Sequence, residues 1–514
     1  MTLVAAGILL SRLSGLISFR IFAHYLGTSM AADAYRAAFR VPNVLQNLLG
    51  EGVLSASFIP VYARLRAEGR DDEAGELAGA AFSMLALVAS LIVAAGVLAA
   101  PLSVAVLAPG FHGEKRELTI ALVRIVFPGT GLLVFSAWCL GVLNSHRRFF
   151  LSYCAPVVMN FAIIGALLWK GGYEHADANS LVRAVSWASV LGALLQFLVQ
   201  APVVYRLLRP LRGATEWRTP HAVAVVAAFV PVFLSRGVFQ ISGFIDLQIA
   251  SFLPGGNVLL NYAQTLYMLP VSLFGMSVSA AELPAMSGAT GTVGEIAETL
   301  RIRVGAGLDR IAFFVVPSAV AFLTLGHVIV AAVFQSGLFG SKDVLFVWAA
   351  LAGSGVGLLA QTLGRLYSST FYALRDTRTP LRFALVRVGL TLGLGYLLAL
   401  PLPRLLGIDP NWGVAGLTSS AGVAGWVEFA LLRRALRRRI GDVDYPASRL
   451  LRLWAAALAG AAVGWAVLAA IPGGHPVLGG GLVLVSYGIV YLLLAHLLGV
   501  GRGLDGLFRR FRRR

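Results

Sequence analysis

Residues 77–108 read LAGAAFSMLALVASLIVAAGVLAAPLSVAVLA, an apolar stretch without one charged side chain. A helix needs about 20 apolar residues to cross the hydrocarbon core of a bilayer, and this stretch is longer than that. Unpaired strand edges cannot be satisfied in lipid, and the sequence lacks the alternating ten-residue pattern of a membrane barrel. Residues 77–108 therefore predict a membrane-spanning helix.

The composition of the whole chain agrees with that prediction. Of its 514 residues, 58% are hydrophobic and 13% are charged, whereas about a quarter of the residues of a soluble globular protein are charged. The two cysteines, Cys139 and Cys154, are too few for a disulfide scaffold or a cysteine-based zinc cluster. These proportions argue against a cytosolic enzyme and favour an all-α polytopic membrane protein.

Comparable apolar stretches, separated by short polar loops, recur along the chain. We expect about fourteen transmembrane helices, at residues 2–23, 34–61, 77–108, 120–143, 150–169, 181–204, 221–249, 259–285, 305–334, 345–372, 383–400, 414–431, 454–470 and 478–499.

The basic residues predict the orientation of these spans. If the N-terminus is cytoplasmic, the loops on the cytoplasmic side carry 27 Lys and Arg and the opposite loops carry 5. Cytoplasmic loops of membrane proteins are enriched in Lys and Arg, so we expect both termini in the cytoplasm. The basic runs near 433–439 and 512–514 would then face anionic membrane lipids. No stacking aromatics accompany these runs, and we expect no nucleic-acid partner.

The sequence also contains an internal duplication. An offset of 224 residues places Leu10-Ser11-Arg12 on Leu234-Ser235-Arg236, Pro60 on Pro284 and Pro156 on Pro380. The offset covers six spans, so the repeats have the same orientation, as in transporters built from two bundles. We therefore predict two six-helix lobes with a cavity between them, at residues 1–220 and 221–440. Residues 441–514 would form two appended helices and a basic cytoplasmic tail.

Ten arginines fall inside the predicted spans. Each costs about 2.5–3.5 kcal/mol at a helix centre unless it meets water, a partner or the bundle interior. Arg36 and Arg40 are four residues apart on one helical face, and Arg12 and Arg236 are repeat equivalents. We expect these four to line the cavity and to bind a phosphate-bearing anion, because Arg holds phosphate through a bidentate fork.

Two other interpretations of the intraspan arginines remain open. They could form structural ion pairs with the acidic residues inside spans, which are Asp33, Glu51, Asp246 and Glu282. Arginines near span ends could instead extend to the lipid headgroups, and we expect this of Arg183, Arg310 and Arg387.

No pattern of a catalytic or metal site accompanies the spans. The histidines, for example His24, His146 and His327, lack metal-ligand spacing, and neither a GxSxG nor a P-loop motif occurs. We therefore expect no catalytic residue, no metal, no cofactor and no enzymatic activity.

One stretch of the sequence resembles a known family. The residues Ala31-Ala32-Asp33-Ala34-Tyr35, Phe39-Arg40-Val41-Pro42-Asn43 and Gly50-Glu51-Gly52 resemble the second-helix signature of the MurJ (MviN) lipid II flippases. Further matches follow in order up to about residue 440, among them Ala108-Pro109-Gly110-Phe111, Leu283-Pro284 and Thr379-Pro380.

The resemblance carries expectations about fold and function. It implies the MOP exporter fold, with two terminal helices that form a groove for a lipid tail. It implies a multi-pass protein of the bacterial cytoplasmic (inner) membrane that moves lipid II, a lipid-linked anionic peptidoglycan precursor, from the inner to the outer leaflet. Cell-wall synthesis proteins are then candidate partners.

The sequence departs from the family pattern at several cavity positions. Ser18-Phe19 stand where the family has an Arg-Asp pair, Gln46 replaces an arginine, and Gln264-Thr265 replace Asp-Arg. Arg12 and Asp33 match family positions, Arg40 matches a basic one, and Arg20, Arg36 and Arg236 are additional charges. The predicted substrate-binding set is therefore Arg12, Arg36, Arg40, Arg236, Asp33, Glu51, Gln46, Ser18 and Arg20.

These departures leave two alternatives to a lipid II flippase. The protein could export another lipid-linked oligosaccharide or amphiphile of the same superfamily, or it could be a membrane scaffold that transports nothing. For a transporter, no motif for ATP hydrolysis is present, so membrane potential, an ion gradient or product consumption would supply the driving force.

Overall fold

The computed structural model describes residues 2–49, 51–208, 243–288, 291–443, 446–471 and 475–500. Within these ranges the regular secondary structure is helical, apart from one isolated bridge between Ser336 and Phe339. The all-α fold class predicted from the apolar stretches is confirmed.

Eleven helices in the described part of the chain are long and apolar enough to cross a membrane. They are Asp71–Leu98, Gly113–Ser145, Phe149–Tyr173, Ala178–Leu207, Gly256–Ser287, Gly294–Thr324, Ser341–Ala373, Arg378–Leu406, Pro410–Ile440, Ala447–Ala470 and Pro476–Leu497. Each contains most of one predicted span.

The other three predicted spans are not among these eleven. The first corresponds to α1 (Thr2–Leu26), which carries Arg12 and Arg20, and the second to α2 (Met30–Leu49) with α3 (Glu51–Ala67). Most of the predicted span at 221–249 lies outside the described residues. The total of fourteen therefore stays a prediction.

The chain divides into two compact units, which are described separately. Unit 1 is Met1–Val258 with Ser336–Phe339, and unit 2 is Leu259–Gln335 with Gly340–Arg514. Residues 243–258 thus belong with the N-terminal helices, and the two last helices belong with unit 2. The predicted boundaries of the two six-helix lobes, at residues 220 and 440, stay a prediction, and so does the internal duplication.

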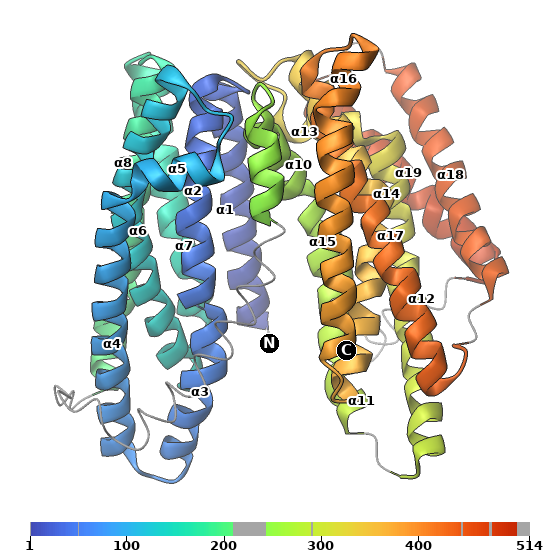
Figure 1. Ribbon diagram of the computed structural model, residues 1–514, viewed down its shortest axis with the longest axis horizontal. Helices are drawn as coiled ribbons and strands as arrows, with labels where there is room; N and C mark the ends of the chain where they lie inside the picture. Colours follow the sequence, from blue (N-terminus) through green and yellow to red (C-terminus); the bar gives the residue numbers. More distant parts are fainter. Residues whose placement is uncertain are drawn as a thin grey trace. The chain divides into compact units, whose positions relative to one another are not determined.

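In unit 1, helices run side by side as a bundle (Figure 1). After α1, α2 and α3 come α4 (Asp71–Leu98), α5 (Ala100–Leu107), α6 (Gly113–Ser145), α7 (Phe149–Ala166), a π-helical turn (Leu167–Tyr173) and α8 (Ala178–Leu207). Helix α6 packs against α2, α4 and α8, while α1 packs against α7. Residues 243–251 form a further helix.

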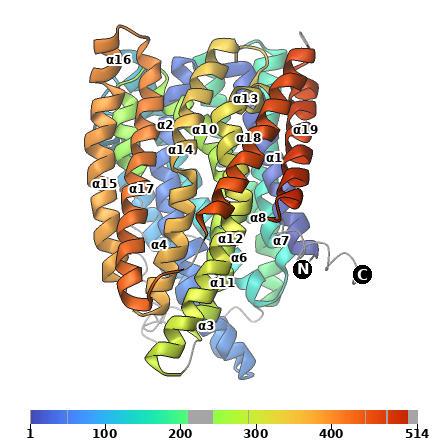
Figure 2. The same cartoon turned by 90° about the vertical axis from the view of Figure 1, so that its right-hand side faces the viewer.

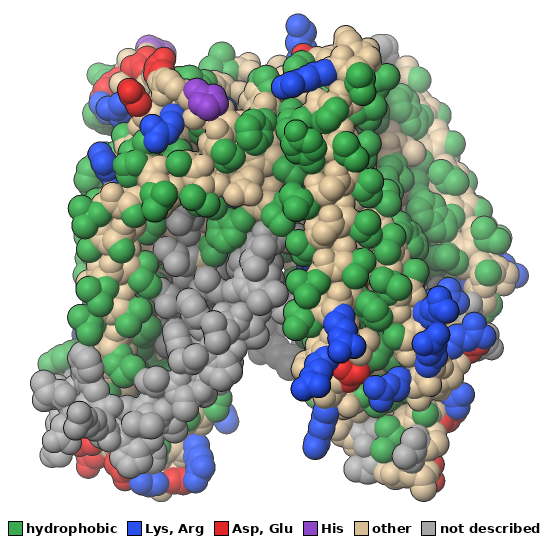
Figure 3. All heavy atoms as spheres, viewed as in Figure 1, with side chains coloured by type: hydrophobic (Ala, Val, Ile, Leu, Met, Phe, Trp, Pro, Cys, Tyr) green, Lys and Arg blue, Asp and Glu red, His purple; other side chains and the backbone are tan. Residues whose placement is uncertain are grey.

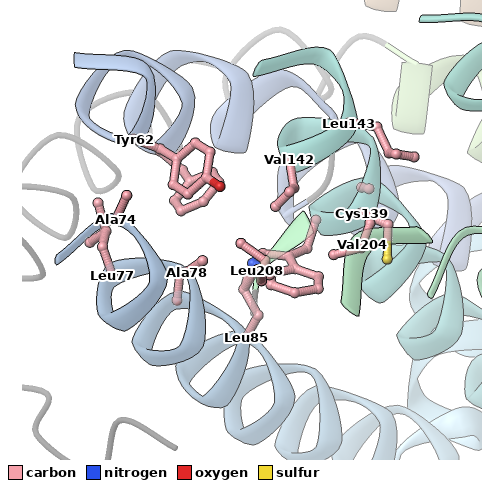
Figure 4. Close-up of a cluster of buried hydrophobic side chains, with 14 of the residues drawn as sticks. Tyr62, Ala74, Leu77, Ala78, Leu85, Cys139, Val142, Leu143, Val204 and Leu208 are labelled. Atoms are coloured by element: carbon pink, nitrogen blue, oxygen red, sulfur yellow. The ribbon is translucent and has the colours of Figure 1, made fainter. Parts of the chain in front are cut away.

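A cluster of buried side chains fixes α3 against α4, α6 and α8 (Figure 4). Tyr62 stacks on Phe58 with ring centroids 5.2 Å apart, and Leu77, Trp138 and Val204 come from the other three helices. Lipid gives helices no hydrophobic reason to associate, so close side-chain packing of this kind holds them together.

Unit 2 begins with α10 (Gly256–Pro270), whose first residues belong to unit 1, followed by a π-helical turn (Val271–Met276) and α11 (Ser277–Ser287). It continues with α12 (Val293–Thr324), α13 (Gly326–Phe334), α14 (Ser341–Ala373), α15 (Arg378–Ala399), α16 (Pro401–Leu406), α17 (Gly413–Ile440), α18 (Ala447–Ala470) and α19 (Pro476–Leu497). Helices α18 and α19 pack on each other (Figure 2).

The closest helix packing in unit 2 joins α14 to α17. A Cβ added at Gly422 would lie 2.9 Å from the backbone nitrogen of Gly357, so the two backbones touch where both residues lack side chains. Small residues allow this approach between helices in lipid.

On the face shown in Figure 3, hydrophobic side chains run along the length of the helices in each unit. Exposed side chains include Leu91 and Leu98 of α4, Leu397 of α15, and Leu482 and Leu493 of α19. Exposed apolar surface on this scale marks a membrane-facing protein. Charged side chains gather at the ends instead, for example Arg437, Arg438 and Arg439 in the last turn of α17.

Candidate functional site

Arg36 is held against the aromatic side chains of α1. Its guanidinium carbon lies 4.2 Å from the centre of the Phe19 ring and 4.3 Å from that of Phe22. Aromatic faces attract cations at this distance, most strongly away from water. The Arg36 side chain is half-buried. Two aromatic rings of α1 therefore position this additional cation of α2.

Arg40 lies one turn further along α2 and meets a different neighbour. Its Nη2 occupies the space that a Cβ would need at Gly243. Asp246, three residues beyond Gly243 on the helix 243–251, interacts electrostatically with Arg40. Arg36 and Arg40 thus share a helix, as predicted, but α1 positions the first and the helix 243–251 positions the second.

Asp33 is fully buried at the start of α2 and binds two groups. Its Oδ1 accepts the backbone N–H of Val258 at 2.8 Å, and its Oδ2 lies 2.5 Å from Nζ of Lys115. Lys115 in turn lies 3.8 Å above the Phe111 ring. Among the described residues, the ion pair of Asp33 is therefore with a lysine on α6.

The remaining predicted residues of unit 1 occupy different environments. On α1, Arg12 is exposed, Ser18 is buried and Arg20 is half-buried. Gln46 lies on α2 and Glu51 begins α3, but their side chains are outside what the structure describes, and Arg236 lies wholly outside the described residues. Substrate binding by this set stays a prediction.

Unit 2 contains a network of polar side chains between its helices. Sequence patterns did not predict this network. Arg387 of α15 pairs with Glu428 of α17, with Nε and Oε2 3.4 Å apart. Tyr267 of α10 donates its hydroxyl hydrogen to Oε1 of Gln361 on α14, at 2.8 Å. Arg365 interacts electrostatically with both pairs.

Arg365 differs from its neighbours in this network. It stands one turn from Gln361 on the same face of α14, and its side chain is exposed. The network holds two guanidinium groups and one carboxylate, which leaves an excess positive charge. Arg365 is exposed beside this excess positive charge, so it can bind an anion without first breaking an ion pair.

Two of the arginines expected to extend to the headgroups form ion pairs in unit 2. One is Arg387, described above. The other is Arg310 of α12, whose Nη1 donates to Oε1 of Glu282 at 2.8 Å, while Arg303 lies 3.6 Å from Oε2 of the same carboxylate. Glu282 is buried, so these cations offset a carboxylate that would be costly alone.

A signal for the unit 2 network was present in the sequence. Arg387 and Glu428 lie at similar distances from the loop that joins α15 to α17, so an antiparallel hairpin brings them to the same depth. Gln361 and Arg365 share the i, i+4 spacing that places two residues on one face. Their alignment with Tyr267 depends on tertiary packing.

No group of three His, Cys, Asp or Glu side chains that could hold a metal ion occurs in the described ranges. The chemistry available in the described parts of both units is that of guanidinium groups that are half-buried or exposed beside aromatic and polar side chains. Such groups recognise phosphate and carboxylate.

Comparison with protein families gives a match over most of the chain. The family model described as lipid II flippase MurJ matches residues 22–497. A lipid II flippase MurJ from Burkholderia cenocepacia is 32% identical over 441 residues, covering 84% of this chain and 82% of the relative. A probable lipid II flippase MurJ from Rhizobium tropici is 30% identical, covering 97% and 93% of the two chains.

Solved structures agree about the fold. A lipid II flippase MurJ in an inward closed conformation superposes with a TM-score of 0.77 at 22% identity, over the whole of both chains. An inward-facing multidrug resistance MATE family transporter of the MOP superfamily gives a TM-score of 0.66 at 20% identity, over 83% of this chain and 95% of the other. The MOP fold expected from the resemblance is confirmed.

Proposed function

Because the chain belongs to the lipid II flippase MurJ family, we propose that it translocates lipid II from the inner to the outer leaflet of the bacterial inner membrane. The family match and the multi-pass fold support this activity together. A flippase moves a polar head group across the membrane and forms or breaks no bond in it.

The observation that carries the proposal is the set of half-buried or exposed guanidinium groups within the helices of each unit. Arg36 and Arg40 supply them in unit 1, and Arg365 supplies one in unit 2. In this proposal they bind the pyrophosphate of the substrate, together with Arg12 and Arg236. Guanidinium groups suit a pyrophosphate because each forms parallel hydrogen bonds to two oxygens.

The mechanism that we propose is alternating access. The head group enters a protein-lined cavity from the cytoplasmic side, while the polyprenyl tail stays in lipid along α18 and α19. Both termini lie in the cytoplasm, which the distribution of Lys and Arg between loops supports. Membrane potential, an ion gradient or consumption of the product drives the cycle.

Complementation of a flippase-depleted bacterial strain tests the proposal. The wild-type chain should restore growth, and accessibility of lipid II at the outer leaflet should rise with its expression. Replacement of Arg12 and Arg236 with Ala should abolish both effects, whereas Arg183→Gln on the exposed face of α8 should not. Full rescue by the double variant at normal expression would refute the role assigned to these two arginines.

A second candidate function rests on the altered cavity positions. Ser18, Gln46 and Thr265 stand where the family carries cations, which favours a differently charged or differently spaced head group. In that case the chain exports another lipid-linked oligosaccharide or amphiphile. Failure to rescue flippase loss, together with transport of a different glycolipid in vesicles, would support it, whereas binding of no glycolipid at all would favour a non-transporting scaffold.

A further inference from the structure

Unit 2 contains a cavity far from the polar network described above. It has a volume of about 530 Å³ and lies among α13, α14, α18 and α19. Most of its wall is apolar, with Val328, Val344, Leu468 and Val483 contributed by the four helices. The volume falls within the range of about 300–1,000 Å³ typical of small-molecule sites.

One end of the cavity carries a cluster of rings with an unsatisfied nitrogen. The ring of His327 lies 5.0 Å from that of Trp465 and 5.4 Å from that of Trp348. Trp348 uses its Nε1 to donate to the carbonyl oxygen of Phe322. Nδ1 of His327 is buried and has no hydrogen-bond partner among the described residues. Buried polar atoms in proteins are nearly always bonded, so this nitrogen is available to bond to an oxygen of a ligand that enters the cavity.

The other polar residues lie at the opposite end of the cavity, because Gln335 follows the last residue of α13, about 12 Å along the helix from His327. Gln335 donates through Nε2 to Oγ of Ser341 at 3.3 Å, and both line the cavity. The next residue, Lys342, is exposed on the first turn of α14. By the predicted orientation this is the outer side of the membrane, where the loops hold only five Lys and Arg. A lysine here favours a ligand with a phosphate group.

The cavity is separate from the proposed pyrophosphate site. Trp348 and Arg365 lie 17 positions apart on the continuous helix α14, which corresponds to about 25 Å at 1.5 Å per residue. A head group bound near Arg365 would therefore sit at a different depth of the membrane from one bound near His327. The polar groups of the cavity can therefore bind a ligand other than the head group of the substrate.

We propose that this cavity binds one glycerophospholipid of the outer leaflet. One acyl chain fills the apolar part among α13, α14, α18 and α19, an ester oxygen bonds to His327, and the phosphate lies toward the end of the cavity near Gln335, Ser341 and Lys342. Exposed Trp465 and Leu345 leave the side of the cavity open to the bilayer, which gives an acyl chain a way in. The bound lipid then joins the α18–α19 pair to α13 and α14.

Photocrosslinking of the full-length wild-type protein in nanodiscs tests the site directly. The probe is a phosphatidylglycerol with a photoreactive group at the end of one acyl chain. Peptides from 326–348 and 465–483 should be labelled several times more densely than α4, whose exposed leucines face bulk lipid. Equal labelling of these segments and α4 would overturn the proposal.

Competition separates a membrane phospholipid from the tail of the substrate. Unlabelled phosphatidylglycerol should displace the probe from these peptides, whereas undecaprenyl pyrophosphate should not at equal concentration. Displacement by the polyprenyl lipid alone would assign the cavity to the substrate tail and overturn the proposal. Neither result depends on whether the chain flips lipid II.

Two variants test the chemistry of the site. His327→Phe keeps a ring between the two tryptophans but removes Nδ1, and it should lower phospholipid retention in native mass spectrometry about tenfold, as expected for losing one buried hydrogen bond. His496→Phe, at the exposed end of α19, is the matched control and should retain the lipid. Lys342→Gln should weaken retention of phosphatidylglycerol, while Arg404→Gln in another outer loop should not. Unchanged retention in His327→Phe would refute the assigned contact.

Discussion

Asp33 and Val258 lie 225 residues apart in the sequence, and the carboxylate of the first accepts the backbone N–H of the second at 2.8 Å. The other oxygen of Asp33 pairs with Lys115. A single buried carboxylate thus links the start of α2 to the start of α6 and to the segment 243–258. We infer that it fixes these three segments in the conformation described here.

Removing the Asp33 carboxylate should destabilise the protein. Asp33→Ala strands Lys115 and the Val258 N–H away from water, and breaking a buried ion pair on one side costs about 3–5 kcal/mol. The unfolding temperature in detergent should therefore fall strongly, and the variant should fail to complement a flippase-depleted strain. Asp33→Asn keeps an acceptor for Val258 and should be less damaging. The double variant Asp33→Asn with Lys115→Met should recover stability relative to Asp33→Asn alone, and additive losses would contradict the pairing.

A methyl group at position 243 should displace Arg40 without unfolding the helix. In Gly243→Ala the new Cβ occupies the place of Arg40 Nη2, which can move because it ends a flexible side chain. Alanine also favours a helix by up to about 1 kcal/mol, so unfolding temperature should hold or rise. Transport should fall, because Arg40 is displaced from the position in which we propose that it binds the head group.

The matched control for that experiment is Gly389→Ala on α15, where an added Cβ meets nothing within 4 Å. This variant should transport like the wild type. Equal transport by both alanine variants would show that the position of Arg40 is immaterial.

The two arginines of the unit 2 network should respond differently to substitution. Arg365 is exposed and no ion pair of its own is found in the described residues, so Arg365→Gln should leave thermal stability within about 0.5 kcal/mol and still reduce transport. Arg387→Met leaves the carboxylate of Glu428 without its partner and should lower stability by a few kcal/mol. If Arg365→Gln transports normally at normal expression, Arg365 has no part in binding the head group.

Acidification should weaken the end of unit 1 near His146. Its Nε2 lies 2.9 Å from the hydroxyl of Tyr62, and burial lowers the pKa of His146, with Arg66 adding to the shift. Because the folded state binds the proton less tightly than the unfolded chain, this residue contributes its full stability above the unfolded pKa of about 6.5. The contribution is lost as pH falls from there toward the folded pKa.

Thermal unfolding measured between about pH 7.5 and about pH 5.5 checks this expectation. The unfolding temperature of the wild type should fall more steeply with acid than that of His146→Gln. The exposed His496→Gln variant should follow the wild type. Identical pH slopes for the wild type and His146→Gln would refute the effect.

Much of the fold could be predicted from the sequence because hydrophobic length is a local property. The stretch at 77–108 predicted a span, and the structure places α4 and α5 there. The family signature around Asp33 and Pro42 was likewise readable in the chain, and the family is confirmed. The division into two units could not be predicted from the sequence in the same way. Residues 336–339 belong to unit 1, where the backbone N–H of Leu338 donates to the carbonyl oxygen of His24.

The candidate site was only partly predictable. The spacing of Arg36 and Arg40 places both on one face of α2, and the sequence shows this without coordinates. Their neighbours depend on other helices, since Phe19 lies on α1 and Gly243 lies 203 residues beyond Arg40. The sequence did not show that Arg387 pairs with Glu428, because that pairing depends on how α15 and α17 pack against each other.

The sequence by itself determined that this chain crosses the membrane many times and carries more cations within its helices than lipid would tolerate unpaired. Burial in lipid depends on the length and polarity of each segment, which are written in order along the chain. Only the tertiary structure decided which charge meets which, as with Lys115 and Asp33. An ion pair acts over a few ångströms, and distances of that order between remote residues are set by how the helices pack.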